Sequence, residues 1–222
     1  IENTIAGSII PNYALIDKNN LHIIGDEYLN IHHHLMALQG QKIMDIKEVW
    51  SHPMALLQCK EFFKKYPHIK LVEDVDTAEV AKRISKENLS GIAAIAPKIA
   101  AEIFKLSILE DEIQTIKDNA TRFVIVQTSE PTNGIDQINK ASLKFQLDHK
   151  RGSLAAILNV LSDCKMSLTK IQSLPVIETP WKYSFFVDVT FESYQEYKKA
   201  ETIIAIMAEE FKVLGTYKNG RK

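Results

Sequence analysis

A hydroxyl and a guanidinium stand side by side at Thr121 and Arg122, followed by Phe123 and an apolar run over residues 124–126. A short apolar run with a polar entrance is typical of a buried strand. In open α/β folds, ligands bind where such strands end. A hydroxyl and a cation at that place would suit an anionic substrate that loses or gains a hydroxyl group.

A second polar group lies near the first residue. Asn3 and Thr4 precede Gly7 and Ser8, where the sequence predicts a helix over residues 8–17. Unpaired N–H groups and the positive end of the helix dipole would favour a bound carboxylate there. A capped helix start without a ligand is the alternative interpretation of the same residues.

The third group is Ser51-His52-Pro53 together with Gln58. These residues predict a helix over residues 51–66, with Ser51 as its N-cap. Seven residues are nearly two turns, so Ser51 and Gln58 would share one face, about 10 Å apart along the axis. Both could serve one ligand, or Ser51 could be only a cap and Gln58 a surface residue.

Several other kinds of site are excluded by the sequence. His32, His33 and His34 are consecutive, and neighbouring strand residues point to opposite faces, so the three cannot converge on one metal ion. There is no Gly-x-Ser-x-Gly elbow, and neither Cys59 nor Cys164 has the context of a nucleophile. No glycine-rich nucleotide loop follows a predicted strand.

The composition is that of an ordinary globular chain. The 222 residues are 45% hydrophobic and 25% charged, with a net charge of -1. This balance excludes a basic surface for nucleic acid or an anionic membrane, and no apolar run approaches the roughly 20 residues of a membrane span. Two cysteines without metal-ligand spacing favour a reducing compartment, here the cytoplasm. Because the chain begins at Ile1 within a motif, we expect a fragment that lacks upstream sequence.

Predicted strands and helices alternate over the first 128 residues, which favours a mainly parallel sheet covered on both faces. Residues 21–38 are predicted to be extended, with strands over 70–73, 91–96 and 121–128, and further helices over 76–86 and 97–104. A polar, turn-rich segment follows, which we interpret as a linker over residues 131–140.

The pattern changes after this linker. Strands are predicted over residues 141–147, 166–175, 183–191 and 211–217, and helices over 153–163 and 194–210. The resulting order, βαββαβ, is the ferredoxin-like arrangement. In the second of these helices, Tyr197, Ala200, Ile204 and Met207 form one apolar stripe.

Four ordered segments together resemble the prephenate dehydratase family. They are Glu-Asn-Thr and Gly-Ser within residues 2–8, Ser-His-Pro-x-Ala-Leu-x-Gln-Cys at 51–59, the small-residue strand at 91–96, and Thr-Arg-Phe at 121–123. Residues 148–154, 168–171 and 183–188 are similar to the family's ACT regulatory domain. The resemblance covers essentially the whole chain, although the family's opening strand and glycine-containing helix are absent.

The resemblance implies a two-lobed α/β catalytic domain, like a type II periplasmic binding protein, over residues 1–130 and a ferredoxin-like ACT domain over 141–222. One lobe would hold residues near 1–10 and 109–130, and the other residues near 16–108. The implied enzyme is a carbon–oxygen lyase that converts prephenate to phenylpyruvate, with loss of carbon dioxide and water, in phenylalanine synthesis. It needs no metal or organic cofactor. Since ACT domains commonly pair, we expect a homodimer or homotetramer.

The same resemblance assigns roles in the active site. Thr121 would stand at the leaving hydroxyl as hydrogen-bond donor and positioner, because an alcohol is too weak an acid to give up its proton fully. Glu2 is the candidate for a true acid, provided that burial raises its pKa. Substrate-binding roles fall to the polar residues Asn3, Thr4, Ser8, Ser51, His52, Gln58 and Arg122.

For the regulatory domain the resemblance implies L-phenylalanine as an effector. Its site would be formed by Gly152, Ser153, Leu154, Gln172 and Ser173. Gln172 and Leu174 stand where the family has Glu and Arg, so a charge pair that could brace the loop is missing. We therefore expect an altered affinity or response. A domain that serves only dimerisation is the alternative.

Two other functions fit the same pattern. An arogenate dehydratase would differ only in the few residues that sense an amine in place of a keto group. A non-catalytic amino-acid-binding sensor would have the same architecture without needing the whole polar set. The dehydratase assignment requires that the four segments converge on one pocket, with the Thr121 hydroxyl facing inward.

Overall fold

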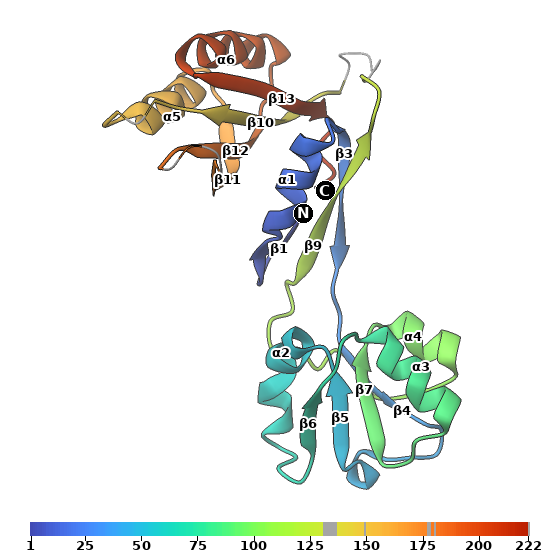
Figure 1. Ribbon diagram of the computed structural model, residues 1–222. Helices are drawn as coiled ribbons and strands as arrows, with labels where there is room; N and C mark the ends of the chain where they lie inside the picture. The colour runs from blue at the N-terminus through green and yellow to red at the C-terminus, as the bar shows by residue number, and fades with distance from the viewer. Residues whose placement is uncertain (131–136, 149, 177–178, 180, 222) are drawn as a thin grey trace. The chain divides into compact units, whose positions relative to one another are not determined.

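The computed structural model describes residues 1–130, 137–148, 150–176, 179 and 181–221. These residues fall into two compact units (Figure 1). Unit 1 comprises Ile1–Leu29 together with Thr121–Lys222, and unit 2 is the single stretch Asn30–Ala120. Most of the predicted linker, residues 131–136, lies outside the described residues.

Unit 2 is built on a five-stranded sheet in the order β6-β5-β7-β4-β8. Its elements are β4 (His34–Ala37), the 3-10 turn η1 (Ile43–Asp45), β5 (Glu48–Ser51), α2 (Pro53–Phe63), β6 (Lys70–Glu73), α3 (Ala78–Glu87), β7 (Ile92–Ala96), α4 (Lys98–Phe104) and β8 (Ser107–Glu110). β5 is parallel to β6 and β7, whereas β4 is antiparallel to β7 and β8. The prediction of a mainly parallel sheet is therefore wrong for β4, which lies between the two strands that α4 connects.

Both faces of the unit 2 sheet are buried, as the alternation along β7 shows. Ala93 and Ile95 pack in a cluster with residues of α2, and Ala94 and Ala96 pack in a second cluster with residues of α3 and α4. Small side chains on a central strand let helices approach the sheet closely from both sides. The sheet thus gives a rigid base to the ends of β5 and β7.

Unit 1 contains a sheet of four strands in the order β2-β1-β9-β3. Its elements are β1 (Glu2–Asn3), β2 (Gly7–Ser8), α1 (Ile10–Lys18), β3 (His22–Asn30) and β9 (Ala120–Gln127). The prediction that the first helix begins at Ser8 is wrong, because Ser8 pairs with Glu2 in the hairpin of β1 and β2, where Gly7 has a φ of 82°. Glycine adopts this left-handed conformation without steric cost.

The C-terminal part of unit 1 has the predicted order βαββαβ and the sheet order β11-β12-β10-β13, with all neighbours antiparallel. Its elements are β10 (Lys140–Gln146), α5 (Ser153–Asp163), β11 (Ser167–Pro175), β12 (Tyr183–Thr190), α6 (Tyr194–Met207) and β13 (Glu210–Tyr217). The helices α5 and α6 pack on one face of this sheet through Ile157, Leu161, Tyr197 and Ile204. Met207, predicted in the same stripe, is 41% exposed.

The opposite face of the C-terminal sheet is also buried within unit 1. One apolar cluster joins the sheet to the N-terminal segment through Tyr13, Ile16, Ile23, Phe186, Leu214 and Tyr217. Because α1 and β3 pack here, residues 16–29 belong to unit 1, while residues 109–120 belong to unit 2. The lobe limits implied by the resemblance are wrong at both places.

A backbone contact between β13 and β3 gives a first testable prediction. A Cβ atom on Gly215 would overlap the carbonyl oxygen of Ile23, and a backbone atom cannot move aside as a flexible side chain can. We expect Gly215→Ala to lower the free energy of unfolding by about 1–3 kcal/mol, measured by urea denaturation. Gly25→Ala is the matched control, since its Cβ would meet Ile125 Cδ1 at an ordinary 3.5 Å. Equal stabilities of the two variants would contradict the close approach.

Candidate functional site

Asn3 and Thr121 lie directly opposite each other on the antiparallel strands β1 and β9. Asn3 Nδ2 donates a hydrogen bond to Thr121 Oγ1 over 3.1 Å. The other end of the same amide accepts the backbone N–H groups of Ile5 at 3.0 Å and Ala6 at 2.9 Å, which fixes its orientation. Because the Thr121 oxygen is an acceptor in this pair, the hydroxyl hydrogen points elsewhere and can be donated to a bound molecule.

Glu2, next to Asn3 on β1, points to the opposite face of the strands, where two cations bind its charge. Its carboxylate contacts Arg122 at 3.1 Å and also Lys170. Burial would raise the pKa of Glu2, but the hydrogen bonds from Lys170 and Arg122 outweigh it and hold the pKa below its usual range. The condition set for Glu2 as a true acid is therefore not met, and the carboxyl group stays ionised at neutral pH. Lys170 also donates to Ser8 Oγ at 2.9 Å. Thr4, the other polar residue predicted here, is exposed.

Arg122 is buried, with 3% of its side chain exposed, on the face of β9 opposite Thr121. Its guanidinium contacts the carboxylates of Glu2, Asp26 and Asp188 and the hydroxyl of Tyr217. Burial would lower the pKa of Arg122, but Asp188 and its other neighbours outweigh it and raise the pKa. A substrate carboxylate could reach this cation only by displacing a buried carboxylate that already binds it.

The N-cap role that the sequence predicted for Ser51 belongs to His52. Ser51 is the last residue of β5; it is fully buried and donates its hydroxyl to the carbonyl oxygen of Ile95 at 2.8 Å. The N-cap of α2 is His52, whose Nδ1 accepts the N–H of Met54 at 3.2 Å. The N-cap prediction is wrong because the strand continues to Ser51, and its hydroxyl is satisfied by the neighbouring strand.

The side chain of Gln58, on α2, is oriented by two residues that the sequence did not assign to the site. Its Oε1 lies 2.9 Å from His33 Nε2 and 3.0 Å from Asn119 Nδ2. Burial lowers the pKa of His33, so the ring is neutral and can donate from Nε2. With Oε1 occupied by two donors, the Gln58 amide presents its N–H hydrogens as donors. Both partners stand in segments that the sequence marks as polar: His33 lies within the histidine triplet, and Asn119 lies two residues before Thr121.

The other two histidines of the triplet pair with acids far away in sequence. His34 Nδ1 lies 3.0 Å from Asp111 Oδ1, and His32 Nδ1 lies 3.2 Å from Glu112 Oε1. With Asn30, Pro97 and Lys98, these four residues line a hollow of ≈ 470 Å³ in unit 2. Among the described residues, no group of three or more His, Cys, Asp or Glu side chains is arranged to hold a metal ion.

The two cysteines are both buried and unpaired. Burial raises the pKa of Cys59 to about 12, so this thiol is not a nucleophile at neutral pH. No helix within the described part of the chain is long and apolar enough to cross a membrane.

The predicted effector residues divide into two places on the C-terminal sheet and its first helix. Gly152 is the N-cap of α5, with a φ of 87°. Ser153 and Leu154 help line a hollow of ≈ 130 Å³, whose other walls include Trp181 and residues at the ends of β10 and β12. Gln172 and Ser173 lie on β11 and do not line this hollow.

The structure thus forms two polar clusters from the predicted site residues. Within unit 1 it joins Asn3 to Thr121 on one face of the paired strands, while Glu2 faces Arg122 on the other face. Within unit 2 it joins Gln58 to His33 and Asn119. The convergence of the four segments on one pocket stays a prediction.

The family model described as prephenate dehydratase matches residues 1–131. Over 230 residues the chain is 37% identical to "Arogenate dehydratase/prephenate dehydratase 2, chloroplastic" of Arabidopsis thaliana, which covers 98% of this chain and 59% of that relative. The chain therefore spans about three fifths of the length of this curated relative.

Solved structures share the fold. The quorum-quenching acylase GqqA has a TM-score of 0.87 at 24% identity, covering 99% of this chain and 80% of that chain. A prephenate dehydratase in complex with L-Phe, from Arthrobacter aurescens, has a TM-score of 0.79 at 24% identity, covering 94% of this chain and 71% of that chain. At these identities the likeness concerns the fold alone.

Proposed function

Because this chain belongs to the prephenate dehydratase family, we propose that it catalyses the conversion of prephenate to phenylpyruvate, carbon dioxide and water. The observation that carries the proposal is the Asn3–Thr121 pair, which leaves a hydroxyl hydrogen to be donated. Hydroxide is a poor leaving group, and a hydrogen bond to its oxygen that strengthens as charge develops lowers the barrier. Loss of the carboxylate as carbon dioxide forms the aromatic ring.

Asn3 and Gln58 have orienting roles in this proposal. The Asn3 amide is fixed by its turn and holds the Thr121 oxygen, while the Gln58 amide offers N–H donors suited to a substrate carboxylate. Both roles depend on side chains whose orientation is set before substrate arrives, which avoids an entropic cost in the transition state. Glu2 is ionised, is bound to Arg122 and Lys170, and has no proton to donate.

The test of the proposed function is turnover. The purified chain is mixed with prephenate, and phenylpyruvate is followed by its absorbance. Formation of phenylpyruvate above the rate of the uncatalysed reaction supports the proposal. Binding of an amino acid without turnover of either dehydratase substrate would instead indicate the non-catalytic sensor.

Arogenate is the second candidate substrate. The relative from Arabidopsis thaliana carries both activities in its name, and the amine of arogenate replaces only a keto group remote from the reacting hydroxyl. Parallel assays with the two substrates decide between them through the ratio of their kcat/KM values.

For the C-terminal part we propose an ACT regulatory domain that binds L-phenylalanine and pairs with a second copy. The βαββαβ order and the hollow beside Ser153 and Leu154 support this role, and a structural relative was solved with L-Phe. The remainder would form the two lobes of a type II periplasmic-binding-protein-like domain. A reducing compartment such as the cytoplasm is our proposal for its location, since Cys59 and Cys164 are buried free thiols.

The hydrogen bond from His33 to Gln58 gives a prediction on activity. His33→Ala is expected to lower kcat/KM for prephenate by about three- to tenfold, the loss of one hydrogen bond that orients the amide. His33→Gln should recover part of the loss, because its amide hydrogen can reach the same oxygen. Equal activity of all three proteins would show that Gln58 is oriented without His33.

A further inference from the structure

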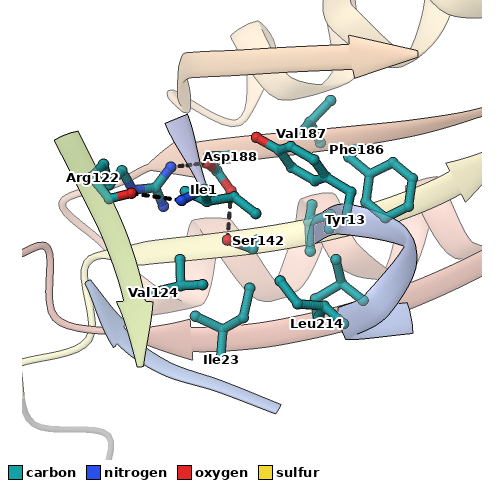
Figure 2. A pocket seen from close by; sticks show the side chains of 12 residues that line it. Ile1, Tyr13, Ile23, Arg122, Val124, Ser142, Phe186, Val187, Asp188 and Leu214 are labelled. Carbon is teal, nitrogen blue, oxygen red and sulfur yellow. Dashed lines mark hydrogen bonds and ion pairs between the residues drawn. The ribbon is translucent and has the colours of Figure 1, made fainter. Parts of the chain in front are cut away.

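Three neighbouring strands of the C-terminal sheet converge on one side chain of β9. Asp188 on β12 binds Arg122 Nη1, and Tyr217 on β13 accepts from Nη2 at 2.9 Å. Ser142 on β10 links the two, because its hydroxyl donates to Asp188 Oδ1 and lies 2.7 Å from Tyr217 Oη. Figure 2 shows Arg122, Asp188 and Ser142 in this row, at the edge of a mainly apolar pocket.

The N-terminal segment holds the same guanidinium from its other edges. Asp26 on β3 accepts from Nε at 2.7 Å, and Glu2 on β1 accepts from Nη1 at 3.1 Å. A planar guanidinium with donors engaged in several directions cannot rotate or slide without breaking charged hydrogen bonds away from water. The position of β9 at Arg122 is therefore fixed relative to the C-terminal sheet.

Thr121 is the residue immediately before this anchor. Their Cα atoms are about 3.8 Å apart, and successive strand residues point to opposite faces. A change in the position of Arg122 must therefore shift the hydroxyl on the other face. We propose that Asp188 and Tyr217 are positioning residues for Thr121, acting through Arg122; this role rests on the proposed function.

A purely structural role explains the arrangement less well. The charges around Arg122 are balanced, with Glu2, Asp26 and Asp188 facing Arg122, Lys140 and Lys170. Buried ion pairs of this kind often add little stability compared with apolar residues of similar volume. What they add is a defined orientation of the groups that they join, and here they orient the strand that carries the Thr121 hydroxyl.

The experiment compares three variants of the full chain. Asp188→Asn and Tyr217→Phe each weaken the hold on Arg122. Lys144→Met is the matched control: Lys144 also ties the C-terminal sheet to the N-terminal segment, through Asp17 at 2.7 Å, but does not contact Arg122. Each variant is characterised by kcat and KM with prephenate, by its melting temperature, and by the 13C shift of the Thr121 methyl group.

In both test variants kcat should fall roughly tenfold, while KM should stay within about twofold of the parent value. This fall in kcat is smaller than the ~100-fold that a 1 Å misplacement costs. The Thr121 methyl shift should move in both, whereas Lys144→Met should lower only the melting temperature. An unchanged kcat in both test variants, or an equal loss in Lys144→Met, would overturn the proposal.

The methyl shift separates this proposal from the proposed function. If the parent chain shows no turnover of prephenate, the function fails. The positioning role is then judged by the Thr121 signal alone: a shift in Asp188→Asn and Tyr217→Phe but not in Lys144→Met supports it, and an unmoved signal refutes it. Tyr217→Phe keeps the test decisive if Asp188→Asn does not fold.

Discussion

Thr121→Ala is expected to lower kcat for prephenate by about 10²–10⁴-fold, the range for removal of a group that assists proton transfer in the transition state. The free energy of unfolding should change by less than about 1 kcal/mol, because the lost hydroxyl is only partly buried. Steady-state kinetics and urea denaturation of the same preparation measure both quantities. A large kinetic loss with an intact fold places the hydroxyl at the reacting atoms.

Thr121→Ser is the matched control for this prediction. It keeps the hydroxyl that accepts from Asn3 and removes only a methyl group. We expect it to retain most of the activity, with a moderate loss because serine has more freedom about its side-chain bond than threonine. If Thr121→Ala kept wild-type turnover, the residue would have no part in the mechanism.

The second large effect concerns stability. Asp26 is fully buried at its side chain and accepts hydrogen bonds of 2.7 Å from Arg122, Lys140 and the backbone of Gly220. Asp26→Asn leaves buried cations without this counter-charge, which typically costs about 3–5 kcal/mol. Urea denaturation at neutral pH measures the change.

Asp74→Asn provides the control for this comparison. Asp74 also pairs with an arginine, Arg83, but both side chains reach solvent, at 20% and 35% exposure. A partly exposed pair of this kind should contribute much less than the buried one, on the scale of the about 0–1 kcal/mol of surface pairs. Similar losses in the two variants would show that burial of Asp26 is not what makes its pairing important.

The same carboxylate predicts an acid dependence. Burial would raise the pKa of Asp26, but the hydrogen bonds from Lys140 and Gly220 and the charge of Arg122 hold it below its ordinary value of 3.8. A lowered folded pKa means that the stabilisation is complete above that value and is lost as the pH falls through the folded pKa. Asp26→Asn should therefore flatten the loss of stability below pH 3.8, and an unchanged acid profile would contradict the assignment.

Periodicity predicted the elements of the C-terminal part closely. The helix over residues 153–163 has the predicted bounds, and the four strands follow the predicted order. The first part was harder because its strands are short and pair with distant partners. The two-residue strand β1 pairs locally with β2 and also with Arg122 and Thr121 of β9, over a hundred residues away.

The candidate site was predictable by residue type more than by environment. Asn3 and Thr121 were both identified and do form a hydrogen bond. The surroundings of Arg122 could not be predicted, because Asp26 and Asp188 give no local signal of their partner. Lys140 and Lys144 alternate with apolar residues on β10, which is typical of a strand with one face in solvent. They are nevertheless buried against the N-terminal segment.

The division of the chain has a consequence for its synthesis. Unit 2 is one uninterrupted stretch, whereas unit 1 needs residues from both sides of it. As the ribosome releases the polypeptide from its N-terminus, Asn30–Ala120 can fold while Glu2 and Asp26 still lack Arg122, Lys140 and Lys170. Unit 1 must then assemble late around a folded insert, so mutations in its charged interior should reduce the yield of folded protein in cells more than mutations in unit 2.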